Sequence, residues 1–320
     1  MSDPVSLVQD AAVVVTGGAG FIGSHLVRAL LENGARRVVI LDSLRTGTWR
    51  NVPDDSRVQR IEMDLGDTGT AGLQSALEGA AYLFHLAAEK HNQSVDAPDR
   101  VLAVNVDGTF RLFAAAAAAG VRKVVFTSSL YAAGRLTLPP MREDDLPDPR
   151  TVYGISKLTG EHLLRHFAAV AGLRFTVFRL FFVYGPRQYA GSGYKSVIVT
   201  NFERILRGEA PVIKGDGRQA LDYIHVDDVV RALLLALSDA ADGEIINIGS
   251  ASAVTVSQLT DWMLEVAASS QEPVHAPADW TAGTHRVCDN GKAARLLGWT
   301  PSVPMREGLA GVYAWMKNEC

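Results

Sequence analysis

Cysteine is nearly absent from this chain, with only Cys288 and Cys320 among 320 residues. Two cysteines make no disulfide framework, and they do not have the spacing of a metal site. We therefore expect no bound metal and a reducing compartment. The sequence shows no basic segment followed by an apolar leader core, and no stretch approaches the roughly 20 apolar residues that span a bilayer. These absences predict a cytoplasmic protein without a membrane partner.

The chain also has no excess of positive charge: it contains 31 Lys and Arg and 35 Asp and Glu, which gives a formal net charge of −4. No Lys/Arg-rich run occurs, so a nucleic-acid partner is not expected. Hydrophobic residues make up 48% of the chain and charged residues 21%, as in an ordinary globular protein. The length allows one large α/β domain with a smaller lobe, or two modest domains.

Short runs of β-branched residues alternate with segments of helical pattern. Continuous apolar strands separated by helices indicate a parallel sheet covered on both faces. We therefore predict an α/β fold, with a Rossmann-type doubly wound parallel sheet and a smaller C-terminal α/β lobe for the substrate. The expected strands are residues 12–16, 37–41, 58–62, 81–85, 123–127, 174–180 and 244–248, and the expected helices are 21–33, 73–77, 101–119, 152–171, 196–207, 226–238 and 256–267.

Two stretches rich in glycine and proline, residues 185–193 and 208–217, mark the expected boundary between the lobes. We expect residues 1–180 to form the NAD-binding domain, to which 222–250 return. Residues 181–221 and 251–320 then form the substrate lobe. Ligands of open α/β sheets bind at the carboxyl ends of the strands, so this lobe is expected to lie over that edge.

Gly17, Gly20 and Gly23 directly follow the first expected strand and open the first expected helix. Glycine lets the backbone turn tightly and approach a pyrophosphate, and a helix N-terminus supplies N–H groups and a positive partial charge. With Phe21 and Ile22, these glycines are the expected phosphate-binding turn of a dinucleotide site. The alternative is a glycine turn without a ligand.

Asp42 ends the second expected strand, 42 − 23 = 19 residues after the last of these glycines. A carboxylate at this spacing accepts hydrogen bonds from the adenine ribose and repels a 2′-phosphate, which favours NAD over NADP. Arg45 lies close enough to receive such a phosphate, so NADP stays an alternative. Asp64 and Leu65 follow the third strand and are expected to meet the adenine.

The string HLAA at residues 85–88 follows the fourth expected strand. Its small side chains let the backbone pass beside the dinucleotide, which makes Leu86, Ala87 and Ala88 candidate cofactor contacts. We expect His85 to be a core histidine rather than a catalyst.

Tyr153 and Lys157 are four residues apart, so a helix places both on one face. A free tyrosine has a pKa near 10 and is a poor base at neutral pH. A nearby ammonium and the positive ring of NAD⁺ both favour the phenolate, which lowers that pKa. Tyr153 can then take a proton from a hydroxyl while hydride leaves the same carbon. Ser129 ends the preceding strand, where its hydroxyl can bind the same substrate oxygen.

These motifs together resemble the extended short-chain dehydrogenase/reductase family, and within it the nucleotide-sugar epimerases and dehydratases. The resemblance covers nearly the whole chain and rests on these strings: TGGAGFIG (16–23), LDSL (41–44), HLAA (85–88), NVDGT (105–109), YGISK (153–157), VYGPRQ (183–188), GDG (215–217), IHVDD (224–228) and LGWTP (297–301).

The resemblance implies a tightly held NAD(H) and a catalytic triad, here Ser129, Tyr153 and Lys157. It also implies that Lys90 and Asn105 lie near the cofactor. Members of the family often form homodimers through two long helices of each subunit, here residues 101–119 and 152–171.

Several departures from the family pattern bear on the reaction. Dehydratases carry Asp-Glu directly after the catalytic serine or threonine, whereas this chain has Leu130 and Tyr131. Neither side chain can serve as the acid or base of water loss, so 4,6-dehydration is not expected. An aromatic of the family pattern is also missing from residues 132–134.

Other departures concern the diphosphate of the substrate. An amide of the family is Phe182 here, and an arginine that binds phosphate is Leu221. Charged hydrogen bonds contribute about 1.5–3 kcal/mol each, so their loss weakens diphosphate binding unless other cations compensate. The candidates for that compensation are Arg187, Lys195, Lys214, Arg218 and Arg286.

The first hypothesis is therefore an NAD-dependent epimerase that oxidises a nucleotide sugar to a keto intermediate and returns hydride to the other face. A second is a dehydrogenase or ketoreductase of a sugar or other polyol that lacks a nucleotide diphosphate. A third is a non-catalytic NAD(H) sensor, which an intact Ser129, Tyr153 and Lys157 set disfavours.

Overall fold

The continuous apolar strands form one parallel sheet, as the sequence predicts. The computed structural model describes residues 7–134, 139–188, 195–279 and 281–319, and within them this sheet has seven strands. In sheet order the strands are β10 (Glu244–Ile248), β6 (Arg174–Leu180), β5 (Lys123–Ser129), β4 (Tyr82–His85), β1 (Ala12–Thr16), β2 (Arg37–Asp42) and β3 (Val58–Glu62). The predicted α/β, Rossmann-type fold is thereby confirmed.

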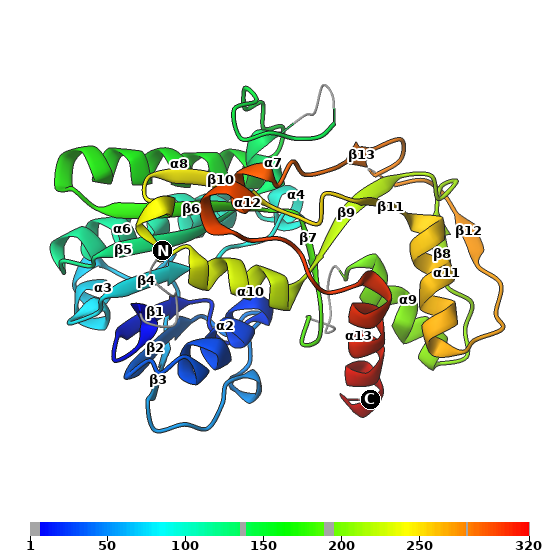
Figure 1. The fold of residues 1–320 in the computed structure, drawn as a ribbon, viewed down its shortest axis with the longest axis horizontal. Helices are drawn as coiled ribbons and strands as arrows, with labels where there is room; N and C mark the ends of the chain where they lie inside the picture. The colour runs from blue at the N-terminus through cyan, green and yellow to red at the C-terminus, as the bar shows by residue number, and fades with distance from the viewer. Residues whose placement is uncertain (1–6, 135–138, 189–194, 280, 320) are drawn as a thin grey trace.

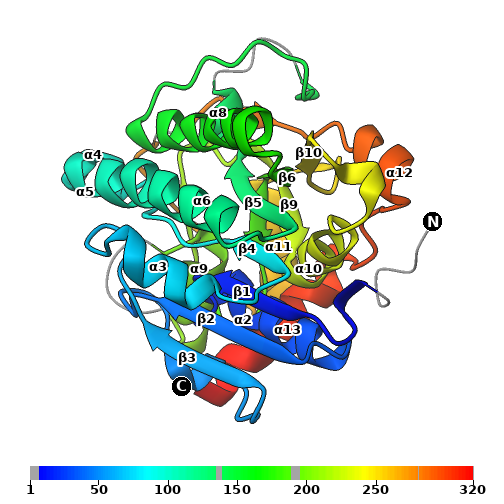
Figure 2. The same cartoon turned by 90° about the vertical axis from the view of Figure 1, so that its left-hand side faces the viewer.

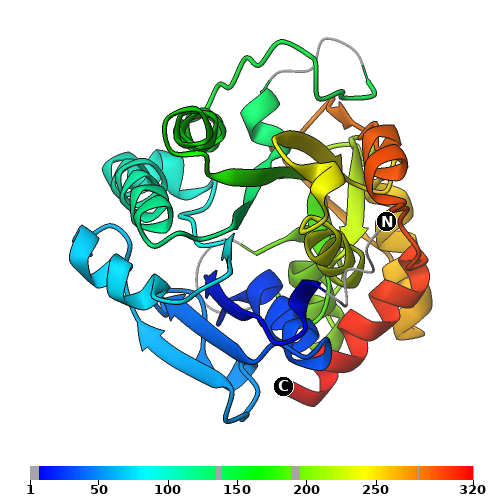
Figure 3. The ribbon, with the colours of Figure 1, turned by 60° about the vertical axis from the view of Figure 1, so that its left-hand side comes forward.

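Alternate side chains of each strand enter two different cores, because successive residues point to opposite faces. In β1, Val13 and Val15 face one helix layer, and Val14 faces the other. Figures 2 and 3 show the sheet between these layers. The first layer contains α2 (Phe21–Glu32), α10 (Val226–Leu235) and α12 (Gly291–Leu297), and the second contains α3 (Thr70–Leu77), α6 (Thr109–Ala118) and α8 (Val152–Ala171).

The helix expected at residues 101–119 is interrupted. It is built from α5 (Pro98–Leu102), a π-helical turn η2 (Ala103–Gly108) and α6. Contrary to expectation, this stretch of 21 residues, Pro98–Ala118, is long and apolar enough to cross a membrane by length and composition, since an 18-residue window within it has a mean hydropathy of 1.3. Half of that window is buried, and side chains of α6 belong to the core on the second face of the sheet, as in the core helix of a globular protein.

The second, smaller lobe lies beyond the carboxyl edge of the sheet (Figure 1). Its largest sheet contains β9, which the sequence analysis did not anticipate, and helix α13 was missed as well. Its elements are β7 (Phe182–Tyr184), β9 (Ala220–His225), β11 (Ala253–Thr255) and β13 (His285–Arg286), the pair β8 (Val212–Lys214) and β12 (Val274–Ala276), and the helices α9 (Val197–Leu206), α11 (Val256–Ala267) and α13 (Met305–Glu319).

A cavity of about 400 Å³ lies where the two lobes meet. Its walls come from the carboxyl ends of four strands that are neighbours in the sheet: Gly17 follows β1, Asp42 ends β2, Leu86 follows β4 and Ser129 ends β5. The strand β7 of the smaller lobe, which follows β6 almost directly, adds Val183. The fold therefore gathers most of the predicted cofactor residues and all three predicted catalytic residues around one space.

Candidate active site

The glycine turn brings the backbone of two strand ends into contact. Gly17 has a φ of +71°, and a Cβ atom built on it would lie 2.9 Å from the amide nitrogen of Ala87. A Cβ on Gly23 would lie 2.1 Å from the carbonyl oxygen of Gly17. Side chains are therefore excluded at both positions, and the first turn of α2 stays open toward the cavity. Gly17, Gly20, Phe21, Ile22 and Gly23 all line the cavity, as predicted.

Asp42 has a structural role that sequence reasoning did not detect. Its two carboxylate oxygens accept hydrogen bonds from the backbone nitrogens of Ala19 and Leu44, each at 2.9 Å. Burial raises the pKa of Asp42, and these two bonds act in the opposite direction. The same carboxylate lines the cavity, so it joins the glycine turn to the loop after β2 at the predicted ribose position.

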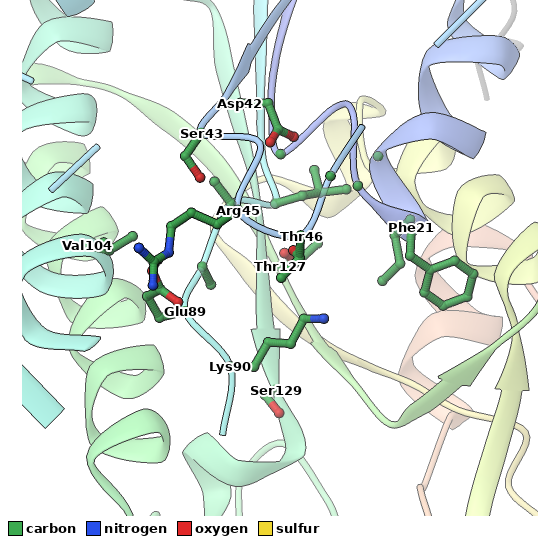
Figure 4. A pocket seen from close by; sticks show the side chains of 18 of the residues that line it. Phe21, Asp42, Ser43, Arg45, Thr46, Glu89, Lys90, Val104, Thr127 and Ser129 are labelled. Atoms are coloured by element: carbon green, nitrogen blue, oxygen red, sulfur yellow. The ribbon is translucent and has the colours of Figure 1, made fainter. Parts of the chain in front are cut away.

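A chain of ion pairs lies along the wall of the cavity that holds Asp42, and Figure 4 shows its first pair, Arg45 and Glu89. Arg45 Nε lies 3.0 Å from Glu89 Oε1, which also accepts a hydrogen bond of 3.0 Å from Arg100 Nε. Arg100 continues to Asp64. These ion pairs were not predicted from the sequence, because the partners are remote from one another along the chain. Arg45, the possible receiver of a 2′-phosphate, is instead engaged with Glu89.

The remaining predicted cofactor residues fall into two groups. Asp64, Leu65, Leu86, Ala87, Ala88 and Lys90 line the cavity. Asn105 does not; it lies behind the loop that carries Lys90. Its side chain accepts from the Glu89 nitrogen at 2.8 Å and donates to the Glu89 oxygen at 3.0 Å. Asn105 thus fixes the backbone of that loop.

His85 is the core residue that the sequence predicts. Its two ring nitrogens are hydrogen bonded to the hydroxyls of Thr16 and Thr109, at 2.8 and 2.9 Å. Burial, and secondly the charge of Lys157, holds the pKa of His85 well below its usual value. The ring therefore stays neutral and supports the backbone at the ends of β1 and β4.

Tyr153, Lys157 and Ser129 line the same end of the cavity. Helix α8 presents Tyr153 and Lys157 on one face, with Lys157 Nζ 5.8 Å from the centre of the Tyr153 ring. Lys157 Nζ donates to the carbonyl oxygen of Thr127 at 2.9 Å, which draws the helix onto β5. Ser129, the last residue of β5, caps the short helix α7 (Leu130–Ala133). The three predicted catalytic residues are therefore brought together.

The pKa of Tyr153 differs from the lowered value that the sequence analysis expects. Burial raises it to about 12, although a hydrogen bond with Ser129 acts in the opposite direction. Burial also lowers the pKa of Lys157 to about 7, and the charge of Glu161 acts against this. In the protein alone, burial therefore has the largest effect on the pKa of both groups, because it disfavours each charged form.

Lys157→Met is expected to stabilise the protein at pH 6 by about 2–4 kcal/mol, since it removes a buried ammonium. Between pH 7 and the ordinary lysine pKa of 10.5, the unfolded chain binds more protons than the folded one. Wild-type stability therefore rises with pH over this range, and the advantage of the variant shrinks. Thermal unfolding from pH 6 to 10 measures this. Lys317→Met, at an exposed site, is the control, and a variant less stable than wild type at pH 6 would contradict the prediction.

A cluster of aromatic rings that was not predicted from the sequence packs beside Tyr153. The His91 ring stacks on Tyr131 with ring centres 4.3 Å apart, and Tyr131 meets Tyr153 at 5.9 Å. The guanidinium of Arg286 lies 5.1 Å from the centre of the Tyr131 ring. Arg286 comes from β13, so this contact connects the smaller lobe to the catalytic end of the cavity. The only sequence signal was the position of Tyr131, two residues after Ser129.

Arg187 is the predicted substrate residue that lines the cavity together with Ser129. Its Nε atom is buried and has no hydrogen-bond partner within the described part of the chain. Burial, followed by the charge of Arg28, lowers the pKa of Arg187 to about 10, while Asp227 acts in the opposite direction. A guanidinium held in this way is suited to an anion.

The other predicted substrate residues do not line this cavity. Phe182 packs against Tyr223, with ring centres 5.9 Å apart, and Leu221 is only 5% exposed within the core of the smaller lobe. Lys195 is paired with Glu203 at 2.6 Å. Arg286, on β13, is the register neighbour of Leu221 on β9. The guanidinium group of Arg286 is therefore carried by the strand next to Leu221, the position where the family pattern has an arginine.

Within the described residues, no group of three or more His, Cys, Asp or Glu side chains is arranged to hold a metal ion. Cys288 is buried, and Cys320 lies outside the described residues.

Comparison with known sequences gives a consistent result. The sequence model of the NAD dependent epimerase/dehydratase family matches residues 13–249. The UDP-glucose 4-epimerase of Mycolicibacterium smegmatis is 35% identical over 313 residues, which cover 96% of this chain and 98% of that protein.

Solved structures agree with this. The UDP-glucose 4-epimerase of Thermotoga maritima with UDP-glucose has a TM-score of 0.89 and 36% identity, covering 96% of this chain and 99% of that one. The UDP-glucuronic acid 4-epimerase of Bacillus cereus, in complex with UDP-glucuronic acid and NAD, has a TM-score of 0.86 and 29% identity, covering 97% and 100% of the two chains.

Proposed function

This chain belongs to the NAD dependent epimerase/dehydratase family, and from that premise we propose that it is an NAD-dependent epimerase that inverts carbon 4 of a UDP-sugar. The observation that carries the proposal is the single cavity that joins the glycine turn to Ser129, Tyr153 and Lys157. A dinucleotide laid along it would reach from Asp42 to the phenol of Tyr153.

The residues around the cavity fit NAD. Side chains are excluded at Gly17 and Gly23, which leaves room for a pyrophosphate against the start of α2. Asp42 disfavours a 2′-phosphate by its charge, and the pairing of Arg45 with Glu89 supports the same choice. Leu65 and Asp64 would contact the adenine, and Lys90 and Lys157 would hold the nicotinamide end.

When bound, NAD⁺ supplies a reversible hydride acceptor and a positive charge beside the phenol. Ser129 would donate a hydrogen bond to the sugar hydroxyl and orient it toward Tyr153. Tyr153 would take the hydroxyl proton as the carbon is oxidised and return it after the keto sugar has turned its other face. The ammonium of Lys157 would stabilise the phenolate, which lowers the Tyr153 pKa from about 12 toward a usable range.

Water loss is disfavoured by the residues that follow Ser129. Leu130 is buried among apolar side chains, and Tyr131 is stacked on His91. Neither offers the carboxyl group that would remove a proton from the neighbouring carbon. An epimerase needs no further acid or base, because the same phenol takes and returns one proton.

A direct experiment tests the function. Purified protein should contain NAD after denaturation, and UDP-glucose should become a mixture with UDP-galactose, resolved by chromatography, without a steady change in absorbance at 340 nm. Stoichiometric NADH release would instead identify a dehydrogenase. Conversion only of sugars without a nucleotide would overturn the assignment of the substrate class.

Arg286→Ala is expected to weaken binding of UDP by roughly tenfold or more, since it would remove the cation next to Leu221 that we assign to the diphosphate. Its NAD content should not change. Calorimetry with UDP measures this, and Arg218→Ala, at an exposed site of the same lobe, is the matched control. Equal affinity of both variants for UDP would remove Arg286 from the diphosphate site and leave Arg187 as its main cation.

The proposal includes a homodimer and a cytoplasmic location. Phe110 on α6 and Ile155 on α8 are apolar and nearly half exposed, at 46% and 47%, and Val170 near the end of α8 is 65% exposed. Two copies that pair these helices would cover this surface, and a molecular mass in solution twice that of one chain would support the homodimer.

We also propose that the chain divides into an NAD-binding domain (1–180 with 222–250) and a substrate lobe (181–221 with 251–320).

A further inference from the structure

A buried ion pair that no step above uses lies behind the catalytic end of the cavity. Glu161 follows Lys157 by one turn of α8, and Arg179 lies in β6; the side chains are only 2% and 3% exposed. Arg179 donates from Nε and Nη2 to the two carboxylate oxygens, at 3.0 and 2.8 Å. The hydroxyl of Ser128 donates to the same carboxylate at 2.6 Å. Glu161 is therefore fixed by three hydrogen bonds.

This cluster connects the two elements that carry the proposed catalytic residues. Ser128 directly precedes Ser129 in β5, and it is the register neighbour of Arg179 in β6. Glu161 belongs to the helix that holds Tyr153 and Lys157. The carboxylate thus sets the helix of the phenol and ammonium against the strand end of the serine.

Rigidity alone does not explain an ion pair here. Replacing a buried pair with well-packed apolar residues is often neutral or stabilising, because desolvating two charges costs several kcal/mol. An apolar replacement cannot supply a negative charge close to Lys157, and the groups around that ammonium show whether it needs one.

The groups around Lys157 include one acid. From β5, it meets the Thr127 carbonyl oxygen and the Phe126 ring, whose centre is 4.9 Å away. From β4, the nearby His85 is neutral, and from α8 come the Tyr153 ring and the carboxylate of Glu161. Burial lowers the pKa of Lys157 to about 7, and Glu161 is the group that raises it.

We propose that Glu161 is a positioning residue that keeps Lys157 in its ammonium form, with Arg179 and Ser128 holding the carboxylate in place. The use of that charge in catalysis rests on the function proposed above, whereas the charge state of Lys157 does not. Glu161 acts only through Lys157, since Glu161 is not among the residues that line the cavity.

The titration of Lys157 tests this without a substrate. In protein labelled with ¹³C at lysine Cε, the Lys157 resonance is assigned by its loss in Lys157→Met. The double variant Glu161→Gln with Arg179→Met replaces the pair with neutral groups of similar size. The Lys157 midpoint should then fall by about one pH unit or more, which is about a tenfold loss of ammonium near pH 8. Arg179→Lys, which keeps both charges, should titrate close to wild type.

Two results would overturn the proposal. One is a Lys157 midpoint that the double variant leaves unchanged, and the other is a wild-type midpoint below pH 6, since Glu161 would then fail to keep the ammonium at neutral pH. If the double variant does not fold, the wild-type midpoint still decides, because a value below pH 6 contradicts the proposal.

The pH dependence of kcat/KM separates a charge effect from a loss of rigidity. The alkaline limb of the double variant should move to lower pH by the same amount as the Lys157 midpoint, with its NAD content retained. A rate that falls equally at every pH would show a purely structural role and contradict the proposal. If wild-type protein converts no UDP-sugar, the proposed function fails while the titration still tests Glu161.

Discussion

Tyr153→Phe is expected to lower the rate of epimerisation by about 10²- to 10⁴-fold, the usual contribution of a positioned acid/base group. The variant loses the phenol hydroxyl that α8 presents to the cavity beside Ser129 and Lys157. Its NAD content should be unchanged, because the glycine turn and Asp42 lie at the other end of the cavity. Initial rates with UDP-glucose, together with NAD released on denaturation, measure both quantities.

The control for this substitution is Tyr313→Phe, which removes a phenol hydroxyl from α13, where the ring packs on Phe202 at 5.2 Å. It should keep the wild-type rate. A Tyr153→Phe variant that retains more than a tenth of the rate would assign the proton transfer to another group. Absence of epimerisation in the wild type as well, with NAD retained by both proteins, would favour the non-catalytic NAD(H) sensor.

Gly23→Ala is expected to abolish retention of NAD through purification. Its Cβ would lie 2.1 Å from the oxygen of Gly17 and 2.7 Å from the Cα of Gly18, so backbone must move to admit it. Such overpacking costs about 1–3 kcal/mol, and moving this turn also changes the N–H groups that face the pyrophosphate. We expect a lower melting temperature in addition to the lost cofactor.

Gly69→Ala is a matched control, because Gly69 has an ordinary φ of −74° and nothing within 4 Å of its Cβ position. It should bind NAD like the wild type, and its melting temperature should fall only slightly, because Gly69 is the N-cap of α3, where alanine is less favourable than glycine. Absorbance at 260 nm relative to 280 nm, followed by an enzymatic NAD assay, gives the cofactor content of both variants. NAD retained by Gly23→Ala would mean that the pyrophosphate lies elsewhere.

The large sheet could be predicted because each of its strands is a local signal. Residues 12–16, 58–62, 174–180 and 244–248 were anticipated with the bounds that the structure has. The strand β9 escaped because Asp222 and His225 break its apolar pattern. Asp222 is fully buried only because Ser250, Ala251 and Cys288 donate hydrogen bonds to it, and these partners come from elsewhere in the chain.

The helix α13 escaped for a similar reason. Gly308 and Gly311 interrupt its helical propensity, yet Gly308 is needed because a Cβ there would lie 2.3 Å from the hydroxyl of Tyr184. Helix packing against the smaller lobe thus selects a residue that local propensity disfavours. The π-helical turn within the predicted helix 101–119 likewise has no sequence signal that we recognise.

In the candidate site, too, features built from neighbouring residues could be predicted, and contacts between distant residues could not. The glycine turn and the Tyr153–Lys157 pair were predictable, since each depends on residues that are close together in sequence. The Arg45–Glu89 pair and the contact of Arg286 with Tyr131 were not, because each joins loops that are distant in sequence. The expected lowering of the Tyr153 pKa also depends on burial, which motif spacing does not report.

The position of β10 has a consequence for how this protein is made. This strand pairs with β6 at the edge of the large sheet, although more than sixty residues separate the two in sequence. While the ribosome synthesises the intervening residues, the backbone of β6 has an open edge on a side that is later covered. Exposed strand edges recruit other chains. Nascent chains stalled before residue 244 should therefore depend on chaperones to avoid aggregation.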